Sequence, residues 1–342
     1  MLFNKTQRRW FIFALAGVLP LILLLGLASG AMDLSLRETL VSLFGGSSQR
    51  QQMIVQVIRL PRVLLAALIG LILAISGAAM QGLFRNPLAD PSLIGVTTGA
   101  SLGASLAIVF AGTLVSASGL SALTLLTFGA FLGGLIATWL VFRLATDGQS
   151  TSVATMLLAG IAVTALAGAV GSLLEYYADN QMLRHISLWR MGGMDGANGM
   201  QVWVALAIAA LLCVFIPRFA TALNAMLLGE SEARYLGVDV DRAKRYLILL
   251  VAIGVGASVA LAGTIAFVGL VVPHITRMLI GPDHRYLLPV SALAGAVLLV
   301  LADTFARVVV LPSELPVGVV TAMLGAPFFI SLLRQRRAYG MA

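Results

Sequence analysis

The chain alternates between long apolar runs and short polar breaks. The runs are about 20 residues long, which is the length that crosses the hydrocarbon core of a bilayer as an α-helix. About ten spans are predicted, at residues 10–29, 63–84, 93–114, 120–143, 153–176, 201–217, 246–262, 264–280, 287–307 and 316–333. The pattern therefore predicts an all-α integral membrane protein, a polytopic bundle of about ten transmembrane helices that forms one domain over residues 1–342.

Composition supports a lipid environment. Hydrophobic residues make up 60% of the chain, charged residues only 11%, and the mean hydropathy is +1.00. This leaves too little polar material to cover a water-soluble globule. In lipid every backbone polar group must be paired within the protein, and the long runs favour helices over the alternating ten-residue strands of a barrel.

The distribution of basic residues predicts the orientation. Lys5, Arg8 and Arg9 precede the first apolar run, which is too long for a cleaved signal peptide, although cleavage remains the alternative. An even number of spans places both termini on one side. Most of the 22 Lys and Arg residues fall on the same side as the N-terminus, so both termini are predicted to be cytoplasmic. The net charge of +8 thus reflects topology rather than nucleic-acid binding.

The residues that a nucleotide-binding, catalytic or metal site would need are missing from the sequence or scattered along it. No G-x-x-x-x-G-K-(S/T) phosphate loop occurs, so ATP hydrolysis would have to take place on another chain. The three histidines do not cluster and Cys213 is the single cysteine, so neither an enzyme site, a metal site nor a bound cofactor is expected. The carboxylates of Glu175, Asp303 and Glu314 lie near outer span ends, which argues against an ion-coupled secondary transporter, the alternative from another class.

Three polar segments are longer than the ordinary breaks between spans, and glycines recur at a regular spacing within two of the spans. Residues 31–57 and 177–200 are predicted external connections with short helices, and glycines four residues apart predict close helix packing. These glycines are Gly95, Gly99 and Gly103 in one span and Gly129 and Gly133 in the next.

The longest cytoplasmic insertion is predicted at 218–245. Within it, Glu230 and Glu232 suit the start of a short helix and Gly237 suits its end. Ala233 would allow another surface to approach closely, and Leu236, on the same face, could fill a pocket in a partner. An ordinary solvated loop is the alternative.

Ordered motifs along most of the chain resemble the FecCD-like permease family of binding-protein-dependent ABC importers for ferric siderophores, haem and cobalamin. The motifs are residues 58–62 (IRLPR), 76–81 (SGAAMQ), 86–91 (NPLADP), 157–160 (LLAG), 229–237 (GESEARYLG), 269–277 (GLVVPHITR), 301–303 (LAD), 314–321 (ELPVGVVT) and 324–327 (LGAP).

The resemblance implies a set of partners. It implies a homodimer, or a heterodimer with a sister permease, resting on two ABC ATPase subunits that bind ATP and Mg²⁺. The coupling helix that engages the ATPase would comprise Gly229, Glu230, Ala233, Leu236 and Gly237. A periplasmic or lipid-anchored substrate-binding protein would dock outside through Arg59 and Arg307, or these arginines would only anchor the membrane interface.

The resemblance also implies residues of the pathway. A cytoplasmic gate would fall at Ser150, Thr151 and Ser152. Arg184, His185 and Arg190 would flank the external mouth, where they could attract an anionic ligand or only orient a helix. Met80 and Gln81 would line the pathway, with core packing as the alternative for Met80.

The function expected from these observations is import across a bacterial cytoplasmic (inner) membrane. The permease would move an iron chelate inward, a ferric siderophore in first place, with haem and cobalamin as alternatives.

Overall fold

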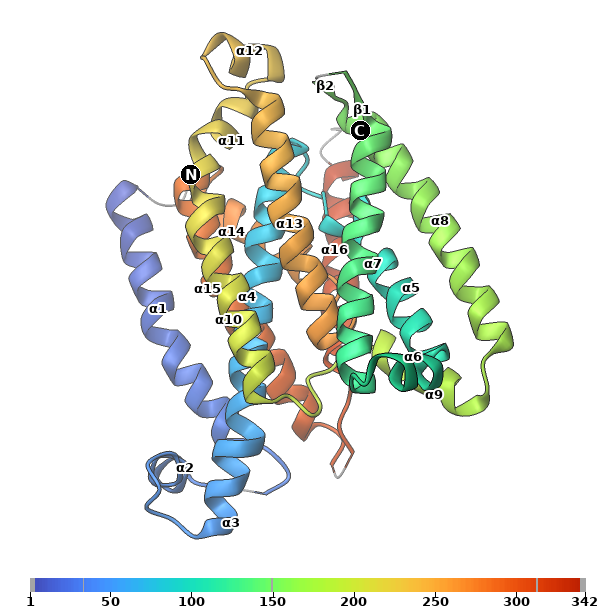
Figure 1. Cartoon of the computed structure of the whole chain (residues 1–342). Coiled ribbons are helices and arrows are strands. Elements are labelled where there is room, and N and C mark those ends of the chain that lie inside the picture. The colour runs from blue at the N-terminus through green and yellow to red at the C-terminus, as the bar shows by residue number, and fades with distance from the viewer. Residues whose placement is uncertain (1–3, 33, 149, 312, 339–342) are drawn as a thin grey trace.

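The computed structural model describes residues 4–32, 34–148, 150–311 and 313–338, which are almost entirely helical (Figure 1). Ten main helices coincide with the ten predicted spans: α1 (Lys5–Ala28), α4 (Leu60–Leu83), α5 (Val96–Val109), α7 (Ala122–Ala145), α8 (Val153–Tyr177), α10 (Gly199–Phe215), α13 (Val240–Ala262), α14 (Val268–Ile280), α15 (His284–Val308) and α16 (Val317–Ala338). The predicted all-α membrane fold is confirmed.

Fewer than ten of these helices have, within the described residues, the length and hydropathy of a complete membrane span. Among the described residues, seven helices are long and apolar enough to cross a membrane, or eight if α5 and the following α6 (Ala111–Ser118), bent by 76°, form one span. The helix α14 has 13 residues and a length of about 20 Å, so it reaches only part of the way across the hydrocarbon core. The count of ten is therefore approximate.

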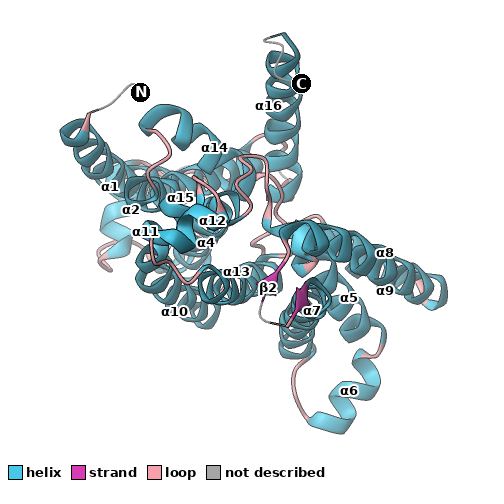
Figure 2. Cartoon of the chain, turned by 90° about the horizontal axis from the view of Figure 1, so that it is seen from above, coloured by secondary structure: helices cyan, strands magenta, loops and turns pink. Residues whose placement is uncertain are grey.

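Short elements gather at the two ends of the bundle (Figures 1 and 2). At one end lie α2 (Leu36–Leu43), α3 (Gln49–Gln52), the π-helical turn Met53–Arg59 and α9 (Asn180–Arg190), so both predicted external segments contain helices. At the other end lie the antiparallel strands β1 (Thr146–Asp147) and β2 (Ser150–Thr151), with α11 (Ala220–Met226) and α12 (Glu230–Tyr235). The 3₁₀ turns are Pro91–Ile94 and Ile216–Phe219.

The helix α4 forms the centre of the bundle. It packs against α10, α13, α14 and α15, and nearly all of its residues from Val63 onward are buried. Glycine makes the closest approaches possible: a Cβ at Gly70 would lie 2.2 Å from the Gly295 carbonyl oxygen, and one at Gly77 would lie 1.8 Å from that of Gly269. In lipid, such backbone-to-backbone packing holds helices together where hydrophobic burial gives little.

The close packing predicted from the glycine spacing is found between α5 and α7. A Cβ at Gly103 would lie 2.0 Å from the carbonyl oxygen of Gly129, and one at Gly99 would lie 2.4 Å from that of Gly133. Gly95 serves a different purpose, because it adopts φ +76° between the 3₁₀ turn and α5. The four-residue spacing thus predicted close packing at Gly99 and Gly103 correctly, and the structure adds that their partners are Gly133 and Gly129.

Candidate functional site

The insertion at 218–245 contains the short helix α12, which protrudes at the end of the bundle where α1 starts and α16 finishes (Figure 1). Gly229 and Gly237 bracket it with φ of +136° and +81°, backbone conformations that glycine adopts without strain. Tyr235 and Leu236 at its tip are 91% and 64% exposed. A short helix with an apolar tip is present, as the sequence predicts.

One detail of that prediction is wrong. Ala233 is fully buried against its own chain, and therefore it does not share an open face with Leu236. The helix is shorter than expected, so Leu236 is its C-cap and points away from the face that packs on the bundle. The side of α12 that remains exposed includes Ser231 and Glu232 as well as the tip residues Tyr235 and Leu236.

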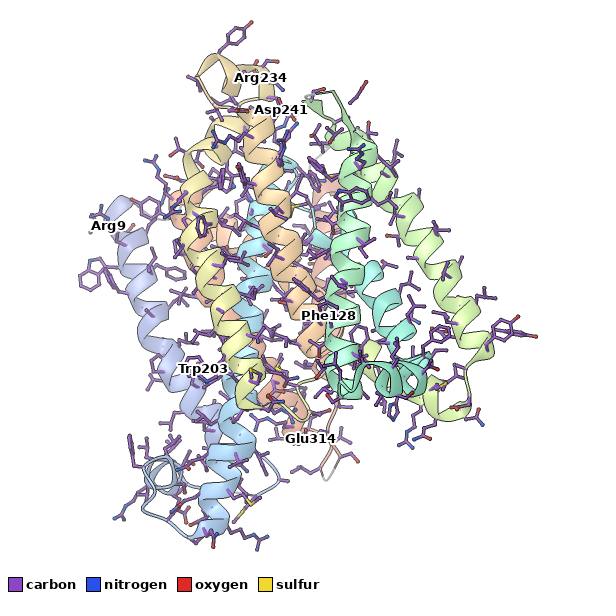
Figure 3. All side chains as sticks on the ribbon, in the orientation of Figure 1. Arg9, Phe128, Trp203, Arg234, Asp241 and Glu314 are labelled. Carbon is purple, nitrogen blue, oxygen red and sulfur yellow. The ribbon has the colours of Figure 1, made fainter. Side chains whose placement is uncertain are left out.

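Polar contacts tie α12 to the bundle. Lys244, in the second turn of α13, donates from Nζ to Glu230 Oε2 over 2.7 Å. Arg234 Nη2 lies 2.8 Å from Asp241 Oδ2, and both residues are labelled at the α12 end in Figure 3. These ion pairs hold α12 in its orientation on the bundle, and neither could be predicted from the local sequence.

The predicted gate residues form the turn between α7 and α8. Ser150 is exposed, Thr151 is buried, and the Ser152 hydroxyl accepts a hydrogen bond from the Thr155 amide that caps α8. The carbonyl of Thr151 accepts from Lys244 Nζ over 2.7 Å, and its amide donates to Asp241 Oδ1 over 3.3 Å. The turn is therefore joined to the segment that carries α12.

A largely apolar face of the chain is exposed on α8 and α16. Leu158, Ile161 and Leu166 on α8 are exposed, as are Met323 and Leu324 on α16. Where α9 ends, a cavity of about 700 Å³ opens between Arg190, Met191 and the small residues of α16. The lining includes Gly318, Ala322 and Ala326, which leave room beside the helix.

The three polar residues expected at the external mouth lie on α9 at the opposite end from α12. Arg184 and His185 are exposed, and His185 lines a second cavity of about 420 Å³ beside α5, α6 and α7. Arg190 is exposed but pairs with Glu175, with 2.6 Å between Nη1 and Oε1. Only Arg190 borders the cavity on the α16 side, so the three side chains do not converge on one site.

Met80 and Gln81 do not line a pathway in this structure. Met80 is fully buried in the core, which bears out packing as its role. Gln81 is 1% exposed, donates to the Leu270 carbonyl and accepts from Arg277 Nη2 over 3.3 Å. In this conformation α14 covers this part of α4, and a pathway role for either side chain stays a prediction.

The two arginines predicted to dock a binding protein lie at the end expected but face inward. Arg59 and Arg307 are 5% and 3% exposed. Arg59 donates to the carbonyls of Leu27, Ala28 and Met32, and Arg307 donates to those of Gly26 and Ser29. Both guanidinium groups thus satisfy carbonyls at the C-terminal end of α1, where a positive charge also suits the helix dipole.

An ion cluster at the same end was not foreseen. Arg62 lies 3.0 Å from Asp303, 3.2 Å from Asp195, and also contacts Glu314, which Figure 3 labels at that end. Asp303, 1% exposed, lies 3.1 Å from Arg307 as well. Desolvation raises the pKa of Asp195 above its usual value, and the neighbouring Arg62 only partly offsets this. The cluster joins α4, α15 and the two loops that precede α10 and α16.

Replacing Asp303 by asparagine tests the cluster. The change keeps the shape but leaves Arg62 and Arg307 without the carboxylate between them, so the free energy of unfolding is expected to fall by about 3 kcal/mol. Thermal unfolding in detergent, followed by size-exclusion chromatography, measures this. Glu314→Gln is the matched control, since that carboxylate is partly exposed and its loss is expected to change stability by less than about 1 kcal/mol. Equal melting of D303N and the wild type would contradict the role.

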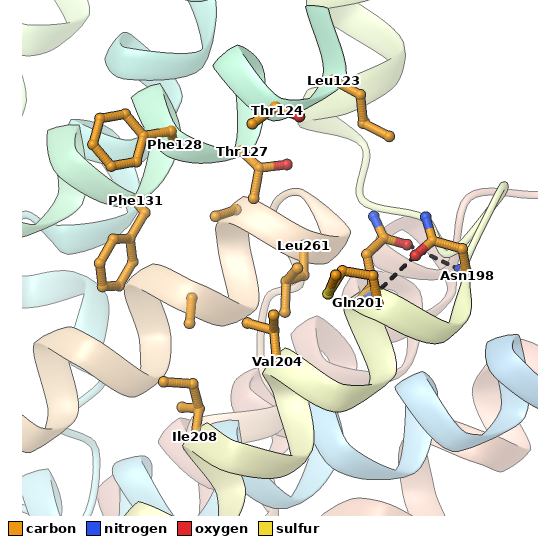
Figure 4. A pocket seen from close by; sticks show the side chains of 13 residues that line it. Leu123, Thr124, Thr127, Phe128, Phe131, Asn198, Gln201, Val204, Ile208 and Leu261 are labelled. Carbon is orange, nitrogen blue, oxygen red and sulfur yellow. Dashed lines mark hydrogen bonds between the residues drawn. The ribbon is translucent and has the colours of Figure 1, made fainter. Parts of the chain in front are cut away.

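Another apolar groove lies between α7, α10 and α13 (Figure 4). Its volume is about 480 Å³, and Phe128, Phe131 and Ile208 line it. Asn198 and Gln201 at one end bond each other's backbone amides in the cap of α10. This groove does not border the exposed faces of α8 and α16.

Comparison with known proteins assigns the chain. A model of the FecCD transport family matches residues 18–335. The chain belongs to the FecCD transport family. It is a permease subunit of the ABC importer type, and the match covers every main helix except the first turns of α1 and the end of α16.

Relatives of this FecCD permease extend over nearly its whole length. It is 47% identical over 322 residues to the hemin transport system permease protein HmuU of Yersinia pestis, covering 94% of each chain. It is 45% identical over 291 residues to the cobalamin import system permease protein BtuC of Halobacterium salinarum, covering 85% of this chain and 76% of that protein. A solved structure titled as an inward-facing conformation of a metal-chelate type ABC transporter superposes with a TM-score of 0.83 at 34% identity, covering 95% and 98% of the two chains.

Proposed function

We propose that this FecCD permease forms part of the membrane pathway of an ABC importer that carries a bulky metal chelate inward. A separate ATPase subunit binds ATP and Mg²⁺ and sits against the tip of α12. A second permease, either identical or a sister chain, faces α8 and α16, and a substrate-binding protein delivers the cargo at the end that carries α2 and α9. The 47% identity to a hemin permease across 94% of both chains carries this proposal.

The shape of the chain supports the division of labour. The tip of α12 is apolar and exposed, as a contact for a partner groove requires, and the sequence holds no phosphate loop of its own. The exposed apolar residues of α8 and α16, with the cavity of about 700 Å³ beside them, suit a pathway completed by a second permease.

The proposed orientation places α12 and both termini in the cytoplasm and α9 outside. It rests on the excess of basic residues at the α12 end, and the membrane is proposed to be the bacterial inner membrane. Docking of a binding protein through Arg59 and Arg307 stays a prediction. It requires these guanidinium groups to exchange the α1 carbonyls for carboxylates of the partner.

Haem is the substrate that the relatives favour, since the hemin permease is 47% identical, compared with 45% over a shorter stretch for a cobalamin permease. The ferric siderophore expected from sequence stays a prediction, because no observation on the pathway distinguishes it. All three cargoes are large metal chelates, and a weakly binding apolar wall of the kind that α16 presents suits each of them.

Uptake into proteoliposomes that contain this chain, its ATPase and its binding protein tests the proposal. Haem, cobalamin and a ferric siderophore are supplied outside, with ATP or a non-hydrolysable analogue inside. ATP-dependent accumulation of haem alone is the expected result. Accumulation of another chelate would correct the substrate and keep the class.

A different result would overturn the class itself. If an imposed proton or sodium gradient drove uptake without ATP and without the ATPase, the chain would be a secondary transporter. Liposomes that lack the permease but hold the other components are the matched control for leakage and for haem partitioning into lipid.

A further inference from the structure

Lys244 is a buried cation that two separate segments share. Its side chain is 1% exposed, and Nζ donates both to the Thr151 carbonyl and to Glu230 Oε2, each over 2.7 Å. Thr151 belongs to β2, 93 residues earlier in the chain, and Glu230 opens α12. One ammonium group thus joins the protruding helix to the turn between α7 and α8.

A second contact runs parallel to the first. Asp241, one turn before Lys244 on α13, accepts from the Thr151 amide over 3.3 Å and pairs with Arg234 of α12 over 2.8 Å. Both polar groups of the Thr151 peptide backbone are therefore held by α13 side chains that also hold α12. Two links in parallel resist rotation as well as separation.

Burial makes the Lys244 link stiff. An ammonium ion removed from water is strongly destabilising unless its donors are satisfied, and here a carbonyl and a carboxylate satisfy two of the three. Moving α12 away from β2 would leave the buried ammonium group of Lys244 without one of its partners. This is far less favourable than moving α12, β2 and the start of α13 together. The three segments are therefore expected to move as one body.

The β2 end of the link leads directly into the apolar face. Thr151 is followed by Ser152, whose hydroxyl caps α8, and α8 carries exposed apolar residues along its length. A displacement of α12 by a partner is thereby passed to the first turn of α8, over a path that bypasses the whole length of α13.

We propose that Lys244 is a positioning residue that transmits movement of α12 to the start of α8, so that ATP hydrolysis on the partner opens and closes the pathway beside that helix. The inference rests on the proposed importer function. It adds the residues that carry the transmission: Lys244 as the shared donor, Glu230 and Thr151 as its two ends, and Asp241 as the parallel link.

Lys244→Met tests this in the reconstituted complex. Methionine is unbranched and only one atom shorter than lysine, and it removes the charge and its donors. ATPase activity is expected to stay within about twofold of wild type while the number of ATP molecules hydrolysed per chelate imported rises at least about tenfold. Arg245→Met is the matched control, because Arg245 is adjacent on α13 but exposed, and its ratio is expected to equal that of the wild type.

The distance between the β1–β2 turn and α12 is a second measurement, and it would not change with ATP if Lys244 only stabilised the fold. With Cys213, the single cysteine, replaced by serine, spin labels at Asp147→Cys and Ser231→Cys report the separation of the β1–β2 turn and α12, since both positions are exposed. In the protein that keeps Lys244, the distribution of distances between the two labels is expected to be the same with and without ATP. With Lys244→Met it is expected to broaden and to shift on ATP binding.

Several results would contradict the proposed role of Lys244. Import at the wild-type ratio by K244M overturns the link, and so does a joint loss of ATPase activity and import in an assembled complex, which would make Lys244 a determinant of ATPase docking instead. If K244M does not assemble, Glu230→Gln, which removes only the partly exposed end of the link, is expected to raise the ratio about threefold, and an unchanged ratio overturns the link. Absence of ATP-dependent import by the wild type would refute the importer function itself.

Discussion

Replacing Leu236 by aspartate is expected to separate the permease from its ATPase. Leu236 is 64% exposed at the tip of α12, and a carboxylate placed there would be buried without a partner in any groove that receives the tip. The loss of an apolar anchor at the centre of a contact weakens binding by roughly 30-fold or more. Import is expected to fall at least as far.

Co-purification of the ATPase with tagged permease measures the result, alongside ATP-dependent uptake. Leu236→Met, which keeps an apolar side chain of similar volume, is expected to behave as wild type. Phe44→Asp supplies a control for an added carboxylate, because Phe44 is 86% exposed and follows α2 at the opposite end of the bundle. Retention of the ATPase at the wild-type ratio by L236D would show that the tip of α12 is not the contact.

Replacing Gly77 by valine is expected to abolish the packing of α4 on α14. A Cβ at Gly77 would lie 1.8 Å from the carbonyl oxygen of Gly269 and 2.5 Å from its carbonyl carbon. Both are backbone atoms, so no side-chain rotation relieves the clash and the helices have to separate. The expected cost is about 3 kcal/mol or more.

The folded yield and the melting temperature in detergent, read by size-exclusion chromatography, measure this effect. Gly17→Val is the matched control: Gly17 also lies within a long apolar helix, α1, but no atom lies within 4 Å of a Cβ placed there. The G17V chain is expected to fold at nearly the wild-type yield. A normal yield of G77V would show that α4 and α14 can separate without loss of the fold.

The glycine contacts show which helix contacts can be predicted from local sequence patterns and which cannot. Glycines four residues apart lie on one helix face, so the spacing predicted close packing at Gly99 and Gly103, and the structure shows Gly129 and Gly133 of the next helix as their partners. Gly77 has no such sign, since its partner Gly269 lies almost 200 residues later. Contacts between distant helices depend on how the whole bundle assembles.

The same distinction applies to the candidate site. Sequence placed the short helix at 230–237 and the exposed tip at Leu236, because turn-forming glycines and a pair of glutamates are local signals. It expected Ala233 to be open to a partner and left Met80 between the pathway and the core, since a small or flexible apolar residue carries no sign of which face is covered. It also treated Arg59 and Arg307 as free for a partner, whereas the end of α1 supplies their acceptors.

The membrane character, the helical spans, the position of the α12 insertion and the resemblance to the FecCD family could all be predicted, because they depend on local composition, periodicity and ordered motifs. The contacts of Lys244 with Glu230 and Thr151, and of Asp303 with Arg62 and Arg307, become visible only in the folded chain. A charge can remain buried only where folding brings a partner to it, and that partner can come from any part of the chain.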